Sequence, residues 1–92
     1  MSEDLEKVET LFNFPCQFPI KVMGHNVAQL VEEVLKSVRP YAPTLEREHI
    51  SVRASRQGNY LGLTINIHAT SKEQLDAIYL VLTSHPLVKV VL

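Results

Sequence analysis

The segment SVRASRQGNYLGLTINIHAT, residues 51–70, contains two runs of alternating apolar and polar residues separated by RQGN. Alternation with a period of two is typical of strands that bury one face. Because Gln-Gly is not a preferred two-residue turn pair, we expect a four-residue loop in which Gly58 has a positive φ. The resulting hairpin would pair Ser55 with Tyr60, Arg53 with Gly62, and Ser51 with Thr64. This register places the polar residues of both strands on one face.

Upstream of the hairpin, residues 14–24 also alternate and predict a strand that ends at Gly24. Residues 26–39 then place apolar side chains at the i, i+3, i+4, i+7 spacing of one helix face. Asn26 is the expected N-cap of this helix, since its side-chain oxygen can accept from the first free amides. Pro40 follows the helix and cannot continue it.

Downstream of the hairpin, Thr70 or Ser71 is expected to cap a second helix, with Glu73 three residues after Thr70 as in a capping box. Pro86 ends the connection that follows. The last segment, LVKVVL at residues 87–92, predicts a final strand.

The order strand, helix, strand, strand, helix, strand is typical of the α+β, ferredoxin-like βαββαβ sandwich. Right-handed crossovers would place the first and third strands at the centre of a four-stranded antiparallel sheet, with both helices on one face. We expect one such domain over residues 14–92, preceded by a polar tail at residues 1–13. The other face of the sheet would stay open, and it would display Lys21, Met23, Arg53, Tyr60, Thr64, Asn66, His68 and Lys89.

Composition narrows the function classes. The formal net charge is −1, so the whole molecule does not attract polyanions, and nucleic acid is disfavoured as a partner. The acidic start MSEDLEKVETLF is unlike a secretory signal, and no apolar run approaches the roughly 20 residues that cross a bilayer. With a single cysteine, Cys16, these features predict a cytoplasmic protein that is not bound to a membrane.

Two hypotheses, RNA binding and catalysis, have little support in the sequence. RNA-recognition modules need several aromatic residues on the central strands, and here Tyr60 stands alone. An enzyme would need a base beside Cys16, which no local motif supplies. His49 and His68 would share the face, but two histidines lack the third and fourth ligands of a zinc site. We therefore expect no catalytic residue, no metal and no cofactor.

Two hypotheses about binding remain. The turn at Gly24, His25 and Asn26 precedes a helix, whose free amides and dipole favour an anion. Alternatively, the last strand carries only one charge, Lys89, and could pair with another protein or a second copy of the chain. The second hypothesis predicts an interaction adaptor. In either case we expect a small-molecule effector or a protein as partner, and a monomer or weak homodimer.

The segments FPCQFPIKVMG, SRQGNYLGLTINIHA and QLDAIYLVLTSHPLVKVVL resemble, in order and spacing, the uncharacterised bacterial YbeD-like family of small proteins. The resemblance covers nearly all of residues 14–92. It implies a fold similar to the ACT regulatory domains, which bind amino acids or other small effectors. It also implies a link to lipoate metabolism, because genes of this family often lie beside one for lipoate attachment. Gly62, where relatives often carry Ser, departs from the family pattern.

Taken together, we predict a non-enzymatic, ACT-like regulatory or small-ligand-binding module, with the interaction adaptor as the alternative and RNA binding as a weaker one. The predicted ligand-binding residues lie at the turn and on the open face. They are Gly24, His25, Asn26, Lys21, Arg53, Tyr60, Asn66 and His68.

Overall fold

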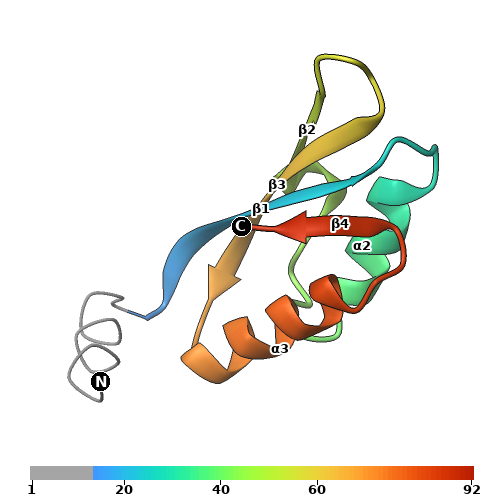
Figure 1. Cartoon of the computed structure of the whole chain (residues 1–92). Coiled ribbons are helices and arrows are strands. Elements are labelled where there is room, and N and C mark those ends of the chain that lie inside the picture. Colours follow the sequence, from blue (N-terminus) through green and yellow to red (C-terminus); the bar gives the residue numbers. More distant parts are fainter. Residues whose placement is uncertain (1–13) are drawn as a thin grey trace.

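The computed structural model describes residues 14–92 (Figure 1). The predicted tail at residues 1–13 lies outside this range. The described elements are β1 (Cys16–His25), α2 (Leu30–Val38), a short 3-10 helix η1 (Arg47–His49), β2 (Ile50–Ala54), β3 (Tyr60–Ala69), α3 (Lys72–Thr83) and β4 (Val88–Val91).

The four strands form one antiparallel sheet in the order β2-β3-β1-β4, so β1 and β3 are central and β2 and β4 are the edges. Both α-helices lie on the same side of this sheet (Figure 1). The α+β, ferredoxin-like βαββαβ fold predicted from the order of the elements is confirmed. Within residues 14–92, neither helix is long and apolar enough to cross a membrane.

The core lies between the sheet and the helices. On β3, Leu63, Ile65 and Ile67 face the helices with 1%, 0% and 0% of their surface exposed. The core-facing residues of β1 and the apolar faces of α2 and α3 close the same cluster. This burial is what the alternation in β3 predicts, because residues two apart share one face of a strand.

The hairpin has the predicted register, with Arg53 opposite Gly62. Gly58 adopts φ +76°, a region that L-residues with side chains rarely occupy. The hairpin projects beyond the helices (Figure 1), so the core-side residues of β2 are not all covered. Val52, which pairs with the buried Leu63 and shares its face of the sheet, is 41% exposed.

The prediction that Asn26 caps the first helix is wrong. Helix α2 begins at Leu30, and its N-cap is Gln29, whose side chain forms no capping hydrogen bond. Of the two candidates at the second helix, Ser71 is the cap, and its hydroxyl accepts from the amide of Gln74 at 3.1 Å. Glu73 does not complete a box; instead the Gln74 side chain accepts from the Thr70 amide at 2.7 Å.

Candidate functional site

The turn after β1 is held by contacts within the chain. Gly24 is buried, and a Cβ there would lie 2.7 Å from Leu30 Cδ1 and 2.9 Å from the carbonyl oxygen of Leu87. The backbone at Gly24 therefore closely approaches the start of α2 and the segment before β4. The amide of His25 donates to the same Leu87 carbonyl at 2.9 Å.

Asn26 ties this turn to the tip of the hairpin. Its backbone amide donates to the Asn59 carbonyl at 3.3 Å, and its side-chain Nδ2 donates to the Gly58 carbonyl at 2.6 Å. The next amide, of Val27, donates to His25 at 2.8 Å. The amides of residues 25–27 are thus already used, and these residues have a clear structural role that joins β1, the hairpin and β4.

The open face of the sheet is basic, although the whole chain is not. The four described strands contain no Asp or Glu, whereas they carry Lys21, Arg53 and Lys89. Lys21 and Arg53 form no ion pair with any residue of the described part of the chain. Three uncompensated cations on one face make a local potential that attracts anions.

Tyr60 lies at the hairpin end of this face, between two neighbours. Its ring centroid is 5.8 Å from that of His25, with the planes tilted by 41°. The ammonium nitrogen of Lys89 lies 5.9 Å from the Tyr60 centroid, within cation–π range. Because its neighbours already engage the ring, Tyr60 is not a free stacking platform.

Lys21, Arg53 and Gly62 line the same hollow on the open face. Its volume is about 200 Å³. We call it the Gly62 hollow, and its lining includes Lys21, Met23, Arg53, Gly62, Thr64 and Leu92. A glycine at this strand position leaves open the space that a side chain would fill.

Asn66 and His68 line a different cavity of about 330 Å³, shared with His49 and the segment that contains Thr44. The Nδ1 atom of His49 accepts from the Glu46 amide at 2.9 Å, which leaves Nε2 as the protonated nitrogen of a neutral ring. Metal binding through Nε2 would need the proton on Nδ1, so it would break this bond. No group of three metal-ligating side chains occurs within residues 14–92.

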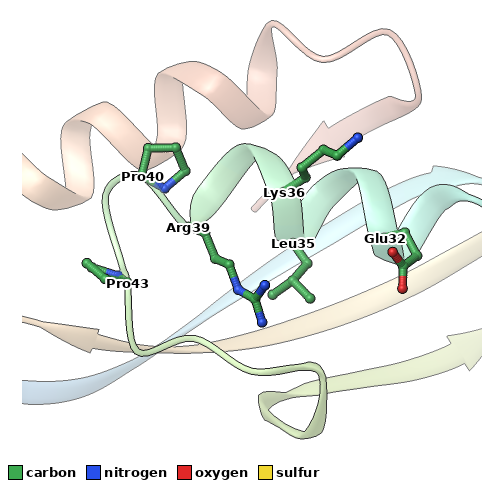
Figure 2. A pocket seen from close by; sticks show the side chains of 6 residues that line it. All are labelled: Glu32, Leu35, Lys36, Arg39, Pro40 and Pro43. Carbon is green, nitrogen blue, oxygen red and sulfur yellow. The ribbon is translucent and has the colours of Figure 1, made fainter.

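A larger cavity of about 490 Å³ lies beside α2 and contains none of the predicted site residues. Figure 2 shows Leu35 and Arg39 pointing from the helix toward the loop that leaves it. The guanidinium of Arg39 is engaged there, because Nε donates to the Leu45 carbonyl at 3.0 Å and a terminal nitrogen pairs with Glu46 at 3.2 Å. Arg39 therefore holds the loop in place, and we do not assign a ligand to this cavity.

The comparisons with known proteins identify the family. A model described as "Protein of unknown function (DUF493)" matches residues 9–92. The chain belongs to this family. It is 49% identical over 84 residues to a UPF0250 protein of Paraburkholderia phytofirmans, covering 91% of this chain and 94% of that protein. It is 48% identical to a UPF0250 protein of Neisseria meningitidis over the full length of both. The resemblance to the YbeD-like proteins is thereby confirmed.

The predicted site residues thus fall into four places. The Gly62 hollow brings together Lys21 and Arg53, the cavity beside His49 holds Asn66 and His68, Tyr60 packs at the hairpin end, and the turn residues bind the chain to itself. The predicted residues omitted Met23, Gly62, Thr64 and Leu92, although these line the same hollow as the two cations. The hairpin register was the available signal, since it places Gly62 opposite Arg53.

Proposed function

We propose that this protein is a non-enzymatic regulatory module that binds a small anion in the Gly62 hollow. The proposal rests on one observation: Lys21 and Arg53 both line the Gly62 hollow, on strands that contain no acidic residue. Arginine binds a carboxylate or phosphate through two parallel hydrogen bonds, and lysine adds a point charge. The ACT-like fold expected from the family resemblance agrees with a regulatory role, which we place in the cytoplasm.

The proposal is tested by amide-shift NMR titration of the ¹⁵N-labelled protein with sodium acetate, inorganic phosphate and a short RNA. We expect acetate or phosphate to shift the amides of residues 21–23 and 62–64 in a saturable way. Lys21→Met and Arg53→Gln should each weaken binding at least fivefold, because each removes one charge from the hollow. Lys36→Met removes an exposed charge on α2 and serves as the matched control.

Shifts at the hollow that persist unchanged in both variants would disprove the assignment. RNA-specific shifts spread over the basic face would instead support the nucleic-acid alternative. A panel without any saturable shift would favour the second candidate function, an interaction adaptor. That alternative draws on the exposed apolar side chains of the β4 edge, where Val90 and Leu92 are 41% and 74% exposed.

A further inference from the structure

Two rows of side chains cross the open face around the Gly62 hollow, running from β2 to β4. Strand pairing defines the first row as Arg53, Gly62, Met23 and Val90. The second row is Ser51, Thr64, Lys21 and Leu92, in which the Leu92 amide donates to the Lys21 carbonyl at 2.8 Å. Over β2 and β3 these side chains are charged or carry a hydroxyl, apart from Gly62, whereas Val90 on β4 and Leu92 after it are apolar. On β1 between them, Met23 is apolar and Lys21 is charged.

The apolar half of these rows is open to solvent. Met23, Val90 and Leu92 are 39%, 41% and 74% exposed. Met23 and Leu92 also line the hollow that Lys21 and Arg53 line. Neighbouring strands lie about 4.8 Å apart, so Val90 is two strand spacings, or about 10 Å, from Gly62. A ligand of that length can place one end over Gly62 and the other over β4.

The side chains of these rows include no carboxylate that would pair with an ammonium group. The described strands carry no carboxylate, and the two charged side chains at the hollow are both cations. An α-amino acid would bring its ammonium group within a few ångströms of the carboxylate, and therefore close to Lys21 and Arg53. Like charges at that distance disfavour binding.

From this arrangement we infer that the ligand of the Gly62 hollow is a monocarboxylate that has no amino group and an unbranched or lightly branched apolar tail, short enough to fit the span of about 10 Å between Gly62 and Val90. This inference rests on the proposed function, since it names the class of anion that the hollow accepts. The carboxylate lies over Gly62, where Arg53, Lys21 and the Thr64 hydroxyl can donate to it. The tail crosses Met23 toward Val90 and removes their exposed surface from water.

The experiment compares four ligands on the same ¹⁵N-labelled protein: acetate, butyrate, hexanoate and norleucine. Norleucine has the carbon skeleton of hexanoate with an added ammonium group, so the pair isolates the effect of that charge. Because the face is open on one side, about half of each methylene is buried, which gives roughly a twofold gain in affinity per methylene. Hexanoate should therefore bind roughly 16-fold tighter than acetate, and norleucine at least tenfold weaker than hexanoate.

Three variants locate the tail and the head group. Met23→Thr should weaken the binding of hexanoate more than that of acetate, because it removes apolar surface that only the tail of hexanoate can cover. Gly62→Val should abolish binding of all four ligands, since a branched side chain fits a strand but fills the hollow. If Gly62→Val does not fold, as judged from its amide spectrum, Arg53→Gln replaces it, and it should weaken all the carboxylates alike.

The outcomes separate this inference from the proposed function. If acetate and hexanoate bind the hollow equally well, or if norleucine binds as well as hexanoate, the inference is overturned while anion binding stands. If no carboxylate shifts the amides of residues 21–23 and 62–64, both the inference and carboxylate binding fall. The inference would also be overturned if affinity rises with tail length but the ligands shift only amides away from the hollow.

Discussion

The two faces of β3 show how one strand can serve the fold and a binding site separately. On the helix-covered face, Leu63, Ile65 and Ile67 are at most 1% exposed. On the open face, Gly62 and Thr64 alternate with them and line a hollow that Lys21 and Arg53 also line. Since successive side chains of a strand point to opposite faces, neighbouring residues along β3 meet entirely different surroundings.

This difference teaches where substitutions should matter for stability and where they should matter for binding. Burial of the apolar face supplies most of the favourable free energy of folding, whereas side chains on the open face already lie in water. Residues there can change with little loss of stability. The open face is therefore the surface on which a ligand site can be altered while the fold is kept.

The largest expected effect is at Ile65. Ile65→Ala removes three carbon atoms from a fully buried position and should lower the free energy of unfolding by about 2–5 kcal/mol, because it leaves a cavity in the core. The matched change on the other face, Thr64→Ala, should cost about 1 kcal/mol or less. Urea unfolding followed by circular dichroism measures both. Equal losses would show that the two faces do not differ as the burial indicates.

A second pair of variants compares two glycines on β1 and β3. Gly24→Ala would bring a Cβ within 3 Å of Leu30 and of the Leu87 carbonyl, so it should destabilise the protein by about 1–3 kcal/mol. At Gly62 the nearest heavy atom to an added Cβ is the Arg53 carbonyl oxygen, an ordinary 3.5 Å away. Gly62→Ala should therefore be tolerated or slightly stabilising. Thermal unfolding of both variants tests this, and a larger loss at Gly62 would contradict it.

The fold could be predicted because its signals are local. Alternation fixed which residues of β3 face the core, and the Gly58 turn fixed the hairpin register, both within a few residues of sequence. The N-cap prediction at Asn26 failed because α2 begins only at Leu30, and the Asn26 side chain donates instead to the carbonyl of Gly58, 32 residues away. A short-range capping rule contains no information about such a partner.

The site could be predicted only in part. Side-chain alternation placed Lys21, Arg53, Asn66 and His68 on one face, and the structure keeps them on it. Which of them share a cavity depends on the bulk of their neighbours and on the loop around Thr44, whose path no periodic pattern describes. The sequence pattern therefore predicts which residues share the open face, whereas three-dimensional packing decides which of them line the same cavity.

A smaller effect is expected at Asn26, which joins the turn to the hairpin. Asn26→Ala removes the 2.6 Å hydrogen bond to the Gly58 carbonyl and should cost about 0.5–1.5 kcal/mol, since the bond is exposed and water can replace it in part. Amide exchange of residues 57–60 should rise more than that of β1. Asn59→Ala keeps the side-chain bond and is the control. Unchanged exchange at the hairpin tip would show that the turn does not stabilise it.

The smallest effect is expected at Tyr79, a residue of α3 that packs against the core. Burial raises the pKa of its phenol above the ordinary value, and its hydroxyl donates to the Leu92 carbonyl oxygen at 3.4 Å. The unfolded chain therefore loses this proton first as the pH rises. The contribution of Tyr79 to the free energy of unfolding is therefore fully present below about pH 10. It is lost as the pH rises through the higher pKa of the folded state. Urea unfolding of the wild type and of Tyr79→Phe at pH 8 and pH 11 should show a steeper alkaline loss in the wild type. Parallel losses in the two proteins would mean that Tyr79 does not contribute to the alkaline limit of stability.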